Sequence, residues 1–129
     1  MNRTIFLTTA GIIALIIGSL ALIAPNFLIT QAKLAEANAA AEVMARTVGV
    51  LLITVGILNI LIRKHADSAT LKSVLIANLI LQLLIVPIDP IAFYNGTFHT
   101  LGSFVPNTII HILLATGFAY YISKIKTTK

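Results

Sequence analysis

Six polar or ionisable side chains lie within or beside long apolar runs of the sequence, and their types suit the recognition of a polar group. They are Glu42, Arg46, Gln82, Asp89, Asn107 and His111. A guanidinium binds carboxylate or phosphate oxygens, an amide both donates and accepts hydrogen bonds, and an imidazole can do either or bind a metal ion. The set predicts a polar ligand-binding site, provided that the fold brings its members together.

Structural explanations compete with the functional one. Glu42 and Arg46 are spaced i, i+4, which on a helix favours an ion pair at the helix entrance, whereas an unpaired Arg46 could bind a lipid phosphate or a carboxylate. Gln82 and Asn107 can serve as hydrogen bonds between helices, and His111 can pack with its polar atoms satisfied. The sequence leaves both explanations open.

Composition identifies the environment of these residues. The chain has 129 residues, of which 58% are hydrophobic and only 10% charged, and its mean hydropathy is +1.00. Soluble domains carry about 25% charged residues, so we expect an integral membrane protein. The net charge of +5 does not indicate a nucleic-acid partner, because the basic residues flank apolar runs, where they meet anionic lipid.

Several kinds of chemistry have no support in the sequence. The absence of cysteine excludes disulfides and thiolate-held metal centres. No phosphate-binding loop, zinc-protease motif or nucleophile elbow is present. We therefore expect no metal and no cofactor, and we prefer a binding role to an enzymatic one.

Four apolar runs predict a single all-α domain over residues 1–129, an integral membrane four-helix bundle with up-down topology. The predicted spans are about 4–24, 43–63, 71–88 and 104–123. Strong helix formers between Gln31 and Ala41 predict a helical lead-in to the second span. Pro87 and Pro90 predict that regular helix stops there.

The second span carries a stripe that should face other helices. At 100° per residue, a polar and glycine-bearing row follows one side of this helix. It consists of Glu42, Arg46, Gly49, Ile53, Gly56, Asn59 and Arg63. The first span offers a matching ridge of small residues, namely Ala10, Ala14, Gly18 and Ala21. Small residues allow membrane helices to approach closely, so both rows predict helix–helix contacts.

Charge asymmetry predicts the orientation. Seven of the nine lysines and arginines fall on the side of the two termini and the middle loop, and only Lys33 and Arg46 fall on the other. The positive-inside rule places both termini in the cytoplasm, in the inner membrane if the protein is bacterial. At 1.5 Å per residue, Gln82 and His111 then lie roughly 10 Å below the outer surface. We expect an outward-facing polar pocket above an apolar interior.

The layout resembles the DoxX-like group of small four-helix bacterial membrane proteins, in particular a member family known only as a domain of unknown function. The matching features are Ala24-Pro25 at the end of the first span, the segment Ala45–Gly49 opening the second, Gly56 on the same face and Arg63 at its close. This group includes respiratory-chain accessory subunits, and distant four-helix relatives bind or isomerise sterols. The resemblance implies a quinone, lipid or sterol-like partner and a role for Arg46.

Three hypotheses follow. The leading one is binding of a lipid-, quinone- or sterol-like amphiphile, with its polar head at Arg46, Gln82, Asn107 and His111 and its tail between helices. The alternative is a non-catalytic accessory or assembly subunit, in a homo-oligomer or larger membrane complex, that docks through its small-residue faces. The third is a membrane isomerase that uses Asp89 and His111 as acid and base within reach of one ligand atom.

Overall fold

The computed structural model describes residues 2–33 and 35–126, and in that part of the chain all regular structure is helical. The long helices are α1 (Arg3–Ile23), α3 (Ala39–Ile62), α4 (Ala69–Ile85) and α6 (Val105–Lys124). Short helical turns connect them, namely α2 (Pro25–Phe27), the π-helical η1 (Leu28–Ala32), α5 (Ile88–Tyr94) and the 3-10 turn η2 (Leu101–Ser103). Four segments are long and apolar enough to span a membrane, with Ala69–Tyr94 counted as one. The predicted all-α class with four candidate spans is confirmed.

Polar caps fix where the helices begin. The side chains of Asn2, Asn38 and Ser68 each accept a hydrogen bond from the backbone N–H three residues later, at Ile5, Ala41 and Leu71. Because Asn38 has extended backbone dihedrals, α3 cannot continue backward into η1. The predicted helical lead-in over 31–41 is therefore wrong in its middle part, and residues 35–38 have no regular structure.

The two prolines after α4 interrupt the helix without ending helical structure. Pro87 caps α5, and the Ile91 N–H donates to the Pro87 carbonyl at 3.0 Å. Pro90 falls in the first turn of α5, where a helix has no internal partner for an N–H. The prediction that regular helix stops at these prolines is confirmed for α4, which ends at Ile85, and wrong for the following segment, since helix resumes at Ile88 and continues to Tyr94.

Glycines bring α1 and α3 into backbone contact. A Cβ added at Gly49 would lie 2.7 Å from the Gly18 carbonyl oxygen, and one added at Gly56 would lie 2.8 Å from the Gly11 carbonyl oxygen. Residue numbers rise along α1 as they fall along α3, so the two helices run antiparallel. The predicted glycine stripe of α3 does face another helix. The small-residue faces were also candidates for docking a partner protein, but these glycines contact α1 of the same chain.

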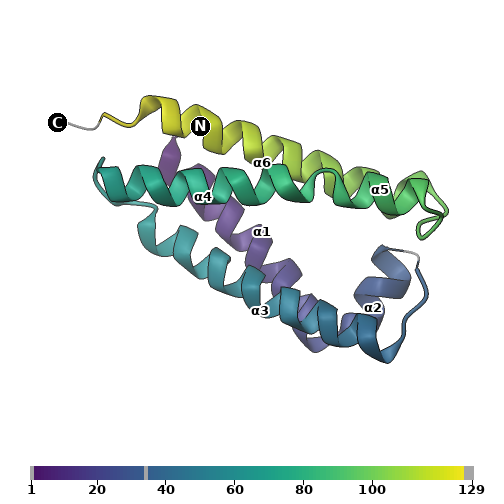
Figure 1. The fold of residues 1–129 in the computed structure, drawn as a ribbon. Helices are drawn as coiled ribbons and strands as arrows, with labels where there is room; N and C mark the ends of the chain where they lie inside the picture. Colours follow the sequence, from purple (N-terminus) through teal and green to yellow (C-terminus); the bar gives the residue numbers. More distant parts are fainter. Residues whose placement is uncertain (1, 34, 127–129) are drawn as a thin grey trace.

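The second helix pair is formed by α4 and α6, which also run antiparallel (Figure 1). The α1–α3 pair meets this second pair mainly at one end, where Phe6 of α1 packs edge-on against Phe118 with ring centroids 5.0 Å apart. A Cβ on Gly117 would lie 2.2 Å from the Phe6 ring, so glycine is required for this approach. Leu7, Leu71 and the rest of the buried core gather around the same contact.

Polar contacts tie the chain together at this end, which we call the basal end. Arg3 forms an ion pair with Asp67 and donates to the His65 carbonyl at 2.7 Å. The backbone N–H of Lys126 also donates to Asp67, at 3.2 Å. The hydrogen bond from Arg3, followed by that from Lys126, holds the pKa of Asp67 below its ordinary value. From this basal end the α1–α3 pair diverges from the α4–α6 pair toward the opposite, apical end, which carries α2 and α5 (Figure 1).

Candidate functional site

Gln82 of α4 and His111 of α6 form a hydrogen-bonded pair in the apical half of the molecule. The distance between His111 Nδ1 and Gln82 Oε1 is 2.5 Å. Gln82 is 7% exposed, because it continues the inward row of Leu71, Leu75 and Asn78 along α4. His111 is placed one turn from Asn107 and two turns from the buried Phe118 on α6. The sequence prediction that these two residues approach one another agrees with their observed contact.

Asp89 lies beyond the Gln82–His111 pair, toward the apical end, and its carboxylate accepts two hydrogen bonds. Its Oδ2 atom lies 2.5 Å from Lys33 Nζ and 2.8 Å from Asn107 Nδ2. Asp89 is 8% exposed, and both of its partners can stabilise a carboxylate. The Lys33 ammonium also lies 5.3 Å from the centroid of the Phe98 ring, within the range of a cation–π contact.

These two groups form one polar band on the α4–α6 pair, which we call the apical polar cluster. It consists of Lys33, Gln82, Asp89, Asn107 and His111. When His111 is neutral, the charged members of the cluster are Lys33 and Asp89, which form an ion pair. The cluster then carries no net charge. Four of its members were predicted from the sequence. Lys33 was not among the predicted site residues, although it was one of the two basic residues assigned to this side.

Glu42 and Arg46 lie apart from this cluster, at the apical end of α3. They form the i, i+4 ion pair at 3.7 Å, and the Arg46 side chain is 53% exposed. Glu42 also accepts from Asn26 at 3.5 Å. Among the described residues neither side chain bonds to Gln82, Asn107 or His111. Arg46 thus forms the ion pair with Glu42 that the structural explanation predicted. It is not part of the polar cluster around Gln82 and His111.

A separate polar pair lies deeper in the molecule. Asn59 Nδ2 donates to Asn78 Oδ1 at 3.1 Å, and this bond joins α3 to α4. Asn78 in turn donates to the Val74 carbonyl at 3.0 Å. Both side chains are buried, and we interpret this pair as the interhelical hydrogen bond that the sequence predicted for residues of this type.

Two apolar cavities, both widely open at the protein surface, follow one another along α1. The first, of about 600 Å³, lies between α1 and α6 and extends from the Phe6 contact to Ile13 and Ile110. Ile110 directly precedes His111 on α6, so the apical end of this cavity and the polar cluster lie at the same height along α6, on faces about 100° apart. We call it the α1–α6 cavity. Its wall also includes Leu113, Leu114 and Thr116.

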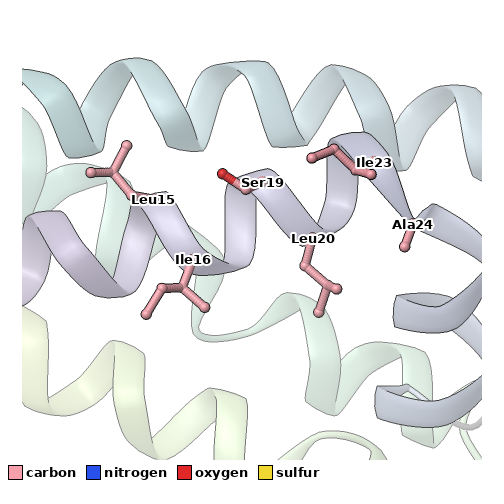
Figure 2. Close-up of a pocket in the computed structure, with 6 residues that line it drawn as sticks. All are labelled: Leu15, Ile16, Ser19, Leu20, Ile23 and Ala24. Carbon is pink, nitrogen blue, oxygen red and sulfur yellow. The ribbon is translucent and has the colours of Figure 1, made fainter.

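The second cavity, of about 500 Å³, lies on the apical half of α1. It is lined by Leu15, Ile16, Ser19, Leu20, Ile23 and Ala24. In Figure 2, Ile16 and Leu20 point away from α3, toward the side on which α6 lies. Ser19 supplies the single hydroxyl among these lining residues. The two cavities therefore provide apolar surface along most of the length of α1.

The chemistry available at the site is hydrogen bonding and weak electrostatics beside apolar walls. Among residues 2–33 and 35–126, no group of three His, Asp or Glu side chains is placed to hold a metal ion. Asp89 and His111 belong to the same cluster, yet each is held by another side chain, Asn107 and Gln82 respectively.

Comparison with known proteins adds no relative. No family model, no curated protein and no solved structure matches the chain. The resemblance to DoxX-like proteins thus stays a prediction that depends on residues of the first two spans.

Proposed function

We propose that this protein is a multi-pass membrane protein that binds one lipid-, quinone- or sterol-like amphiphile. The polar head contacts the apical polar cluster, and the apolar part occupies the α1–α6 cavity. The observation that carries this proposal is that the two features lie at the same height on α6, where Ile110 lines the cavity and the next residue, on a neighbouring face of the helix, is His111 of the cluster. Ligand sites commonly combine apolar walls with a few convergent polar groups.

Burial supports a site at this position. The basal contact between Phe6 and Phe118 is closed, with both residues at most 5% exposed. Farther along α6 Leu113, which lines the cavity, is 65% exposed, and toward the apical end the two helix pairs diverge (Figure 1). An amphiphile in this position covers apolar surface at about 25 cal/mol per Å² and still reaches hydrogen-bonding partners at its head.

Cavity filling tests the proposal. Leu113→Trp places an indole in the α1–α6 cavity, whereas Ile112→Trp, on the neighbouring residue, places the same group on a surface that lines neither cavity. Native mass spectrometry of gently extracted protein reports bound amphiphile. We expect a stoichiometric adduct on the wild type and on Ile112→Trp, and its loss on Leu113→Trp. Equal adduct on both variants, or none on the wild type, contradicts the proposal.

We also infer that the helices follow an up-down path with both termini in the cytoplasm, which places the apical polar cluster in the outer half of the membrane. The support is the distribution of the lysines and arginines among the described residues, six on the basal side and two on the apical side. The ninth, Lys129, lies outside the described residues. The chain has no cysteine, so Asn95→Cys and Ser68→Cys each create a single thiol. A membrane-impermeant maleimide added to intact cells should label the first and not the second, and the reverse pattern contradicts this orientation.

A further inference from the structure

We propose that the Gln82–His111 pair recognises a neutral hydroxyl group of the amphiphile. This inference rests on the proposed function and narrows its ligand class. Among the described residues, the hydrogen bond between the pair uses His111 Nδ1 and Gln82 Oε1 and leaves His111 Nε2 and the Gln82 amide nitrogen without a partner. Neither of these two atoms is fully buried.

The pair offers one donor and one acceptor whichever way its protons are arranged. If Gln82 Oε1 accepts, the imidazole proton is on Nδ1, so Nε2 presents a lone pair beside the donating amide NH₂. If the amide is turned by 180°, its nitrogen donates to Nδ1, so the Nε2 proton becomes the donor and the amide oxygen the acceptor. In both arrangements a donor and an acceptor remain.

A hydroxyl group can bind either atom in either arrangement, because it donates one hydrogen bond and accepts others. An ether oxygen only accepts, and a carboxylate or phosphate oxygen only accepts as well. The charge of the cluster points the same way. Lys33 is already paired with Asp89, and Arg46 is paired with Glu42 on α3, so no unpaired cation of the cluster is left to bind an anionic head.

Three probes of equal chain length separate the possibilities. We would measure displacement of tritiated 1-hexadecanol from the full-length protein in detergent micelles by unlabelled 1-hexadecanol, by hexadecyl methyl ether and by hexadecanoate, with concentrations expressed as mole fractions in the micelle. We expect the alcohol to bind about three- to tenfold more tightly than the ether, the value of one hydrogen bond. We expect hexadecanoate to bind no better than the ether.

Variants assign this preference to the pair. Gln82→Leu and His111→Phe should each reduce the alcohol-to-ether preference to about one, whereas Thr54→Val, which removes an exposed polar group of α3, should leave it unchanged. A spectroscopic readout covers the case in which a variant fails to fold. In wild-type protein with ¹⁵N-labelled histidine, 1-hexadecanol should shift the Nε2 resonance of His111, and the ether should shift it less.

The outcomes separate this inference from the proposed function. Saturable binding of alcohol and ether with equal affinity overturns hydroxyl recognition and leaves amphiphile binding standing. Tighter binding of hexadecanoate overturns the neutral ligand class. Absence of saturable binding by every probe contradicts both the inference and the proposed function, and an unshifted His111 resonance in the presence of bound alcohol contradicts the inference alone.

Discussion

Adding one methyl group at Gly49 should weaken the α1–α3 contact strongly. The new Cβ of Gly49→Ala would lie 2.7 Å from the carbonyl oxygen of Gly18 and 2.8 Å from the backbone nitrogen of Leu22. Ordinary contact begins at 3.4 Å, so the helices must separate by about 0.7 Å on this side. Both obstructing atoms belong to the backbone, and no side-chain rotation relieves the clash.

The cost of this separation is that of overpacking a tight interface, about 1–3 kcal/mol of the free energy of unfolding. Gly102→Ala is the matched control, because its added Cβ meets only the Thr100 hydroxyl oxygen, at 3.8 Å. We expect the control to stay within about 0.5 kcal/mol of the wild type.

Titration with sodium dodecyl sulfate in mixed micelles measures this difference. Phe27→Cys and Tyr94→Cys, both at exposed positions, allow donor and acceptor dyes to be attached to a chain without other thiols. Loss of energy transfer should occur at a lower detergent fraction in Gly49→Ala than in Gly102→Ala. Identical transitions in the two variants would refute the backbone contact between α1 and α3.

Three further predictions use the same unfolding assay. Asn78→Leu leaves buried Asn59 without its partner and should cost about 1 kcal/mol, whereas replacing both asparagines with leucine should recover most of that loss. Because the folded state lowers the pKa of Asp67, the free energy of unfolding should fall as the pH drops through the range in which this carboxylate gains a proton, and Asp67→Asn should remove that dependence. Lys33→Met leaves the mostly buried Asp89 carboxylate without its counter-charge and should cost about 1–2 kcal/mol of the free energy of unfolding. A flat pH profile would contradict the Arg3–Asp67 contact, and an unaffected Lys33→Met variant would contradict the Lys33–Asp89 ion pair. A double variant no more stable than Asn78→Leu would contradict the Asn59–Asn78 hydrogen bond.

The features that could be predicted from the sequence are those with a regular period or a sufficient apolar length. Four apolar runs predicted the four long helices within a few residues of their observed ends. The 100° spacing of Gly49, Gly56 and Asn59 predicted correctly that this face of α3 is buried against other helices. The spacing of Asn107 and His111 similarly placed both on the side of α6 that meets α4 and α5.

Arg46 shows where this reasoning fails. It shares the helical face of Gly49, but a shared face ensures burial only as far as the partner helix extends. α1 ends at Ile23, and Pro25 starts a different turn, so the part of α3 that carries Arg46 lies beyond the close glycine contacts and its side chain remains exposed. How far two helices stay in contact depends on the tertiary structure, and the residue spacing within one helix does not predict it.

Lys33 could not be predicted as a partner of Asp89 for a different reason. It follows η1 in a segment without regular secondary structure, where no spacing relates one side chain to the next. Its position depends on Asn38, which caps α3 and prevents continuous helix between η1 and α3. Neither the Asn38 cap nor the absence of regular structure over residues 35–38 was predicted from the sequence.

The most direct test of the account is to locate a bound amphiphile on the protein. A photoactivatable long-chain alcohol with a diazirine a few carbons from its hydroxyl, irradiated in the presence of the wild-type protein, labels the residues that this part of the chain contacts, and mass spectrometry of the digested protein identifies them. The account predicts saturable labelling of the α1–α6 cavity, at Ile13, Ile110 and Leu113. Labelling spread evenly over exposed residues outside both cavities, such as Leu61 and Leu84, would contradict it.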